Sequence, residues 1–118
     1  MNVREIQERI NELHYWDARV RSLNCNHFAD EVVLTYEDTD YIVVYNFYGC
    51  FKVLFNHSID YTKDLPVKEL KPSQLPYFIQ DVFLEEVEED GVKLNKCQIS
   101  MPPLNLEIWC NQIEVEKV

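Results

Sequence analysis

Most of this chain carries its apolar residues at every second position, the spacing of a β-strand that buries one face. The segment EVVLTYE at 31–37 is typical, being rich in β-branched and aromatic residues. The run YIVVYNFY at 41–48 is apolar on both faces, which favours a strand covered on both sides. The strand-like segments are residues 15–22, 31–37, 41–48, 51–55, 81–89, 92–101 and 104–116. This spacing predicts about seven antiparallel strands, joined largely in chain order within residues 15–56 and 79–116.

The first thirteen residues follow a different period. Val3, Ile6, Ile10 and Leu13 recur at helical spacing, which predicts a helix over residues 1–13 with one apolar stripe and Asn2 as its cap. That stripe needs an apolar surface to cover. A length of 118 residues predicts one domain, 1–118. We therefore expect a mainly β (α+β) fold, with the N-terminal helix packed on a curved antiparallel meander that forms a half-barrel or small sandwich.

Several positions interrupt the alternation. Gly49 predicts either a β-bulge or a tight hairpin between two of the expected strands. Asp90-Gly91 is a strong signal for a two-residue hairpin turn. The apolar phase slips twice, which predicts a bulge at 95–96 and a second irregularity at 111–112. Residues 57–76 contain three prolines and alternating charge, so they are expected to form one long loop.

The charge of the chain limits its partners. It has 21 Asp and Glu against 11 Lys and Arg, giving a net charge of −10. Phosphate backbones bind through Lys and Arg, and the basic residues here are scattered, so neither nucleic acid nor an anionic membrane is an expected partner. The same charge favours encounter with a cationic protein, but it also serves simple solubility, and the composition leaves both explanations open.

The N-terminal segment MNVREIQERINELH carries charges throughout and has no apolar core of a signal peptide or membrane span. We therefore expect a cytoplasmic protein. In a reducing cytosol its cysteines are expected to be thiols and not disulfides. These are Cys25, Cys50, Cys97 and Cys110.

Sequence patterns that carry chemistry are sparse. Cys25 and His27 have suitable ligand atoms for a metal, but zinc sites normally show paired spacings that this chain lacks. His14 and Asp17 have the chemistry of a general base and its partner, yet no glycine-rich elbow marks a nucleophile. We expect no catalytic residue, no bound metal and no cofactor. An enzyme built around His14, Asp17 and Cys25 stays as an alternative.

Carboxylates are the best organised functional groups in the sequence. Four glutamates crowd one expected strand, and two tyrosines lie in or beside the long loop, where aromatic and acidic residues together suit a protein interface. The expected partner-binding residues are Glu85, Glu86, Glu88, Glu89, Tyr61 and Tyr77. Acidic residues at a strand edge also prevent aggregation, so the glutamates fit a solvated edge as well as a binding site.

Four segments of the chain resemble one family. They are the Leu13-His14 pair ahead of an alternating strand, YNFYGCFKVLFNHS (45–58), LPYFIQDV (75–82) and MPPLNLEIWC (101–110). Together they are similar to small β-rich bacterial immunity proteins encoded beside LXG-type polymorphic toxins. The chain departs from that pattern after the opening His14, where Tyr15 stands in place of the expected Asp, and Asp17 follows later.

The resemblance implies a non-catalytic protein that binds and blocks one cognate toxin domain. A toxin that acts on nucleic acid is usually cationic, so an acidic inhibitor would be steered to it. A small-molecule or carbohydrate-binding β-module, with aromatic residues on a concave sheet face, is the competing hypothesis. An uncharacterised structural domain is another, and the oligomeric state is left open.

Overall fold

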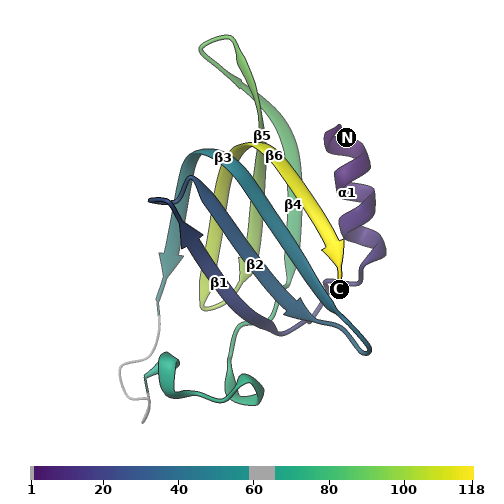
Figure 1. Ribbon diagram of the computed structural model, residues 1–118, viewed down its shortest axis with the longest axis vertical. Helices are drawn as coiled ribbons and strands as arrows, with labels where there is room; N and C mark the ends of the chain where they lie inside the picture. The colour runs from purple at the N-terminus through teal and green to yellow at the C-terminus, as the bar shows by residue number, and fades with distance from the viewer. Residues whose placement is uncertain (1, 59–65) are drawn as a thin grey trace.

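The computed structural model describes residues 2–58 and 66–118, which form one helix on one curved sheet (Figure 1). The described elements are α1 (Val3–Glu12), β1 (Val20–Asn26), β2 (Glu31–Glu37), β3 (Ile42–His57), β4 (Asp81–Glu89), β5 (Val92–Met101) and β6 (Leu104–Lys117). The strands pair antiparallel in the order β1-β2-β3-β6-β5-β4. Two three-stranded meanders are thus joined where β3 pairs with β6. The expected fold class is confirmed.

The two edges of this sheet meet at one end. Arg19 and Phe78 form a β-bridge between the chain ahead of β1 and the chain ahead of β4. On either side of it Val20 N donates to Tyr77 O at 2.8 Å, and Ile79 N donates to Ala18 O at 2.9 Å. A curved sheet that closes at one end and stays open along the rest is a half-barrel.

The inner face of the half-barrel and α1 form the core. Ile6, Ile10 and Leu13 supply the helical stripe, and the Tyr36 hydroxyl donates to Leu13 O at 2.8 Å. Tyr45 is also fully buried, and its hydroxyl lies 3.4 Å from that of Tyr36. Burial raises the pKa of Tyr36 to about 12. Because these rings are packed against each other and the helix, they offer no stacking surface to a sugar or other ligand.

Helix α1 also covers an exposed sheet edge. Its Gln7 side chain accepts from Leu84 N at 2.8 Å and donates to Val82 O at 3.2 Å. Both backbone groups belong to the outermost strand, β4. A side-chain amide therefore takes the place of a neighbouring strand, which is one way of protecting an edge from aggregation. The cap is also as expected, since Asn2 Oδ1 accepts from Glu5 N at 2.9 Å.

The prediction of about seven strands is corrected to six in the described residues. The segments 41–48 and 51–55 are one strand, because the chain does not turn back at Gly49 and instead has a bulge just after it, between Cys50 and Lys52. Gly49 has φ +60°, and a Cβ there would lie 2.8 Å from Asn111 Nδ2. The long connection begins only after His57 and contains two short 3₁₀-helices, Val67–Glu69 and Pro72–Gln74.

The strand expected at 15–22 is wrong at its start. Ala18 N donates to Tyr15 O at 2.9 Å, which closes a turn, and Trp16 is 72% exposed. Strand β1 begins at Val20 and runs past Cys25 to Asn26. The alternating residues Trp16 and Ala18, which were expected in this strand, precede it and belong to the turn. Local alternation over so few residues did not distinguish a strand from a turn.

The bulge expected at 95–96 is also wrong, because β5 keeps continuous register with β4 and β6. Leu94 is buried on the opposite face from Cys97, beside Phe51, so apolar residues lie on both faces of this strand. At 111–112, Cys110 and Ile113 are both buried although they are three residues apart, but β6 keeps its register with β3 from Ile113 to Cys110, so the pairing shows no irregularity there. No helix in residues 2–58 and 66–118 is long and apolar enough to cross a membrane.

Candidate functional site

The four predicted glutamates lie on the β4–β5 hairpin, which projects beyond the rest of the sheet (Figure 1). Strand alternation places Glu85 and Glu89 on one face and Glu86 and Glu88 on the other. Glu85 Oε1 lies 3.4 Å from Lys96 Nζ, and Glu86 Oε1 lies 3.8 Å from Lys93 Nζ. Among the described residues, Glu88 and Glu89 form no ion pair. The glutamates are therefore not one uniform patch, and whether they contact a partner stays a prediction.

The two predicted tyrosines differ in what the structure says of them. Tyr61 lies outside the described residues. Tyr77 is buried, and its hydroxyl lies 2.8 Å from His57 Nε2. Burial raises the pKa of Tyr77. Its side chain offers a partner little surface, so its described contacts are those of a packing residue.

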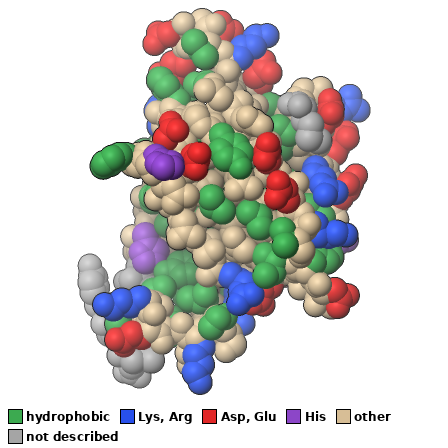
Figure 2. Space-filling view, viewed as in Figure 1, with side chains coloured by type: hydrophobic (Ala, Val, Ile, Leu, Met, Phe, Trp, Pro, Cys, Tyr) green, Lys and Arg blue, Asp and Glu red, His purple; other side chains and the backbone are tan. Residues whose placement is uncertain are grey.

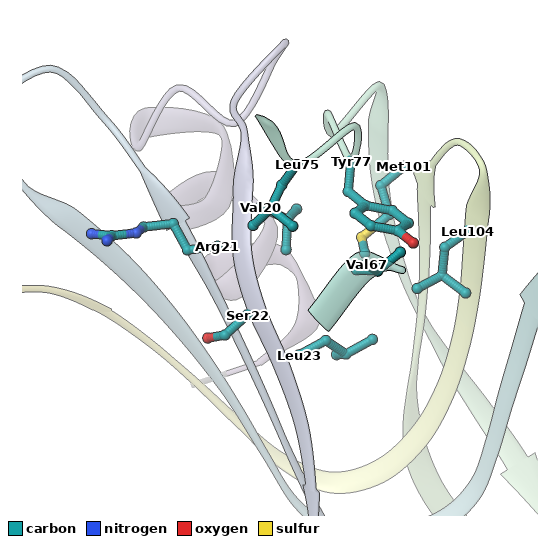
Figure 3. Close-up of a pocket in the computed structure, with 9 residues that line it drawn as sticks. All are labelled: Val20, Arg21, Ser22, Leu23, Val67, Leu75, Tyr77, Met101 and Leu104. Atoms are coloured by element: carbon teal, nitrogen blue, oxygen red, sulfur yellow. The ribbon is translucent and has the colours of Figure 1, made fainter. Parts of the chain in front are cut away.

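Tyr77 lines an apolar hollow of about 230 Å³ between β1, the connection after β3, and the β5–β6 turn. Figure 3 shows the side chains of Val67 and Met101 beside its ring and Leu75 next to Val20, whereas Arg21 points away. The Arg21 guanidinium instead pairs with Glu37, at 3.1 Å. The hollow attaches the connection to the half-barrel through apolar contacts and presents few groups able to orient a polar ligand.

The cysteines are poor nucleophiles where they lie. Cys97 and Cys110 are buried in the core, and burial raises the pKa of Cys110 to about 12. Burial also raises the pKa of Cys50 to about 11 and, to a smaller extent, that of Cys25 on the surface. A thiol with a raised pKa is rarely a thiolate at neutral pH. Within the described ranges, no three His, Cys, Asp or Glu side chains are grouped as a metal ion would need.

His14, Trp16 and Asp17 line a polar hollow of about 290 Å³ at the closed end of the half-barrel. Asp17 Oδ1 accepts from Gln80 Nε2 at 3.1 Å. His14 and Asp17 both have positive φ, 44° and 59°, and Trp16 between them is exposed. Cys25 does not line this hollow, so the three residues of the enzyme hypothesis do not come together.

A different hollow forms where two turns and the β3 bulge meet, and we call it the turn-end hollow. It has a volume of about 360 Å³ and is lined by Asp30, Gly49, Cys50, Phe51, Glu89, Asp90, Val92, Leu94 and Asn111. These residues come from the end of the β1–β2 turn, the β3 bulge, the β4–β5 turn with its flanking strands, and β6. Cys50 N donates to Asp30 O at 2.9 Å, which fixes the first turn to the bulge.

The turn-end hollow combines exposed apolar groups with negative charge. Phe51 is 59% exposed and Val92 is 52% exposed. The carboxylates of Asp30, Glu89 and Asp90 surround them, and none of the described residues that line the hollow is Lys or Arg. Of the glutamates predicted from the sequence, only Glu89 belongs to it. An apolar centre with a polar rim is typical of a protein-binding site.

Beside this hollow, the outer face of the sheet carries a second acidic cluster that sequence reasoning missed. Glu31, Glu114 and Glu116 surround Tyr48, whose pKa is raised by burial and then by these three charges. Figure 2 shows acidic side chains around the hairpin tip and over the strands below it. Glu31 on β2 and the glutamates of β6 are far apart in sequence and meet only because both strands pair with β3. The alternate spacing of Glu114 and Glu116 was the one available signal.

Elsewhere on the outer face, two lysines from β3 and β5 flank the Trp109 ring of β6. The Trp109 ring lies between Lys52 Nζ, at 4.3 Å from its centroid, and Lys96 Nζ, at 5.4 Å. Glu107 accepts from Trp109 Nε1 at 3.1 Å and lies 3.7 Å from Lys96 Nζ. These cations are thus held by an aromatic face and a carboxylate, away from the lining of the turn-end hollow.

A half-barrel that displays aromatic and carboxylate side chains at one end has the features of a protein-binding domain. The family model for Immunity protein PIM7 matches residues 2–117, nearly the whole chain. The chain therefore belongs to the PIM7 immunity protein family, and the resemblance to immunity proteins is confirmed at that level. Comparison with curated proteins finds no match.

Proposed function

We propose that this protein binds a cognate bacterial toxin domain in the cytosol and blocks it without catalysing a reaction. The match of nearly the whole chain to an immunity family carries this proposal, since an immunity protein acts by binding its toxin. The geometry supports it, because exposed aromatic residues and carboxylates lie together while the candidate catalytic residues do not. On the sequence resemblance, we assign the toxin to the LXG-type polymorphic toxins.

We further propose that the toxin surface is cationic. The net charge of −10 produces a field that accelerates association with a positively charged protein. Acidic residues of the turn-end hollow and of the cluster around Tyr48 lie next to each other, since Asp30 precedes Glu31 and Tyr48 precedes Gly49. A toxin that acts on nucleic acid needs a basic substrate surface, which an acidic inhibitor would cover.

The first experiment is binding of the purified toxin domain encoded beside this chain. We expect a stable complex in size-exclusion chromatography and restored growth when both proteins are expressed together. If the two proteins do not associate at micromolar concentrations and growth is not restored, the proposed function is wrong.

The second experiment tests the charge. Glu88→Lys with Glu89→Lys should lower the association rate with the toxin roughly tenfold at low salt and flatten its salt dependence. The Glu85→Lys and Glu86→Lys pair should have a smaller effect, because lysines already offset those two carboxylates. Glu12→Lys, at the far end of α1, is the control for charge reversal elsewhere. Association rates that match wild type in the Glu88 and Glu89 variant would remove the hairpin glutamates from the interface.

A further inference from the structure

The β1–β2 turn holds its central residues in a backbone conformation that their side chains disfavour. Asp30 N donates to His27 O at 3.1 Å, closing a four-residue turn. Its central residues Phe28 and Ala29 have φ +58° and +69°, and His27 before them has φ +53°. Positive φ at both central positions is the feature of type I′ hairpin turns, where Asn and Gly are strongly preferred. Phe and Ala carry a Cβ that clashes with the backbone in this region.

In the described part of the chain, the Phe28 side chain makes no packing contact with the core that would stabilise the fold. The relative exposure of Phe28 is 109%, so its ring is fully in water and not part of the core. A strained backbone and an exposed large apolar side chain are both unfavourable for the isolated protein. When such features persist they mark a functional position more often than a structural one.

Phe28 lies two residues before Asp30, which lines the turn-end hollow, and its own side chain extends into solvent outside that lining. Together with Phe51 on β3 and Val92 at the start of β5 it supplies three exposed apolar side chains from three separate segments. Aromatic anchors inside a polar rim are where the binding energy of protein interfaces concentrates. The acidic rim favours a partner with positive charge, because a buried carboxylate is stabilised by a guanidinium or ammonium group.

We propose that the turn-end hollow is the docking site for the toxin domain. A lysine or arginine side chain of the toxin enters the hollow between the carboxylates of Asp30 and Glu89. Apolar toxin residues beside it pack on Phe28 and Phe51. This proposal rests on the proposed function above and names the surface and the partner chemistry that the function uses.

The hollow is preorganised for this role. The hydrogen bond from Cys50 N to Asp30 O fixes the first turn, and Asn95 Nδ2 on β5 donates at 3.1 Å to the backbone oxygen of Asn111, a residue that lines the hollow. Glu89 and Val92 are paired as the last residues of a regular hairpin. A binding surface whose backbone is already ordered loses less entropy when its partner arrives.

The affinity of the toxin domain for two aromatic variants tests the apolar part. Phe28→Ala and Phe51→Ala should each weaken binding roughly tenfold to a hundredfold, as truncation of an anchor residue does. Phe83→Ala is the matched control, because Phe83 is 50% exposed but lies on β4 beside Asp81 and Gln98, away from the hollow. Its affinity should stay within about twofold of wild type, well below the loss for an anchor. Wild-type affinity in both anchor variants overturns the proposal.

The carboxylates are tested by Asp30→Asn and Glu89→Gln, with Glu12→Gln as the control. Losing one partner of a buried charge pair acts mainly on dissociation, so the two hollow variants should dissociate at least several-fold faster. Unchanged dissociation rates contradict the entry of a cation between these two residues.

Hydrogen exchange on the wild-type complex tests the location without any substitution. Amides in 27–31, 49–52 and 89–92 should exchange more slowly when the toxin is bound. Protection confined to α1 or to the hollow around Trp16 overturns the docking site. If the wild-type protein binds the toxin but this footprint is missing, only the docking site is wrong. If the wild-type protein does not bind, the proposed function itself fails.

Discussion

Two hairpin turns of this protein both hold their two central residues at positive φ but are built from opposite kinds of residue. In the β4–β5 turn the central residues are Asp90 and Gly91, with φ +51° and +78°. In the β1–β2 turn they are Phe28 and Ala29, at similar angles. Asp-Gly is among the best pairs for this geometry and Phe-Ala among the poor ones. The first turn is suited to folding, whereas the second keeps an unfavourable pair and presents an aromatic ring to solvent.

The difference between the two turns can be expressed as a difference in folding free energy. A residue with a Cβ costs roughly 1–2 kcal/mol in the left-handed region, and Gly avoids this cost. A Cβ on Gly91 would have no heavy atom within 4 Å, so φ alone explains the need for glycine there. The whole fold is expected to be stable by only about 5–15 kcal/mol, so a strained turn is a noticeable loss. The β1–β2 turn thus costs the free protein stability, and what it provides in return is an aromatic ring exposed to a partner.

Transferring the poor pair into the good turn should have the largest effect on stability. Asp90→Phe with Gly91→Ala should lower the free energy of unfolding by about 2 kcal/mol, because it adds a Cβ at positive φ and removes a favoured turn residue. Urea denaturation measures this, and a matched substitution of Asp90→Asn should be close to neutral. A loss below about 0.5 kcal/mol, the scatter of ordinary surface changes, would mean that this turn does not depend on its residues.

The reverse exchange should have a smaller effect with the opposite sign. Phe28→Asn with Ala29→Gly should raise the free energy of unfolding by about 1–1.5 kcal/mol, because both central residues then favour positive φ. The gain is limited by the greater freedom of glycine in the unfolded chain. A destabilised double variant in urea denaturation would show that Phe28 makes contacts the fold needs, and the contrast between the turns would fail.

The single substitution Ala29→Gly should have the smallest effect, a gain of about 0.5–1 kcal/mol in the free energy of unfolding. It relieves strain at one residue and leaves the Phe28 ring in place. Thermal denaturation is sensitive enough, since a change of this size moves Tm by a few degrees in a domain of about this length. A lower Tm would contradict the assignment of strain to Ala29.

The same two turns show what the sequence could and could not predict. The Asp90-Gly91 turn was predicted because the local preference of these residues agrees with the final geometry. The alternation of apolar residues predicted most strands for the same reason. Phe28-Ala29 gave no signal, because its conformation is set by the pairing of Asn26 with Glu31 and by the bond from Cys50 N to Asp30 O. Leu94 led to the wrong prediction of a bulge at 95–96, because the β3 bulge covers the face of β5 on which Leu94 lies.

The candidate site was predictable only in part for the same reason. Glu89 was named from the sequence, and it lines the turn-end hollow. Asp30 and Phe51 reach the same hollow from other strands, which no local pattern reveals. Glu31 and Glu114 come together only through β3. Tyr77 was expected at an interface but is buried by the connection that precedes β4.

The most direct test compares Phe28→Gly with Ala29→Gly in one buffer, by urea denaturation of the free protein and calorimetric titration with the toxin domain. Both variants relieve a left-handed residue, so both should unfold at higher urea than wild type. Only Phe28→Gly should lose affinity, by at least roughly tenfold, because it alone removes the aromatic anchor. Equal toxin affinities in the two variants would contradict the role given to the strained turn.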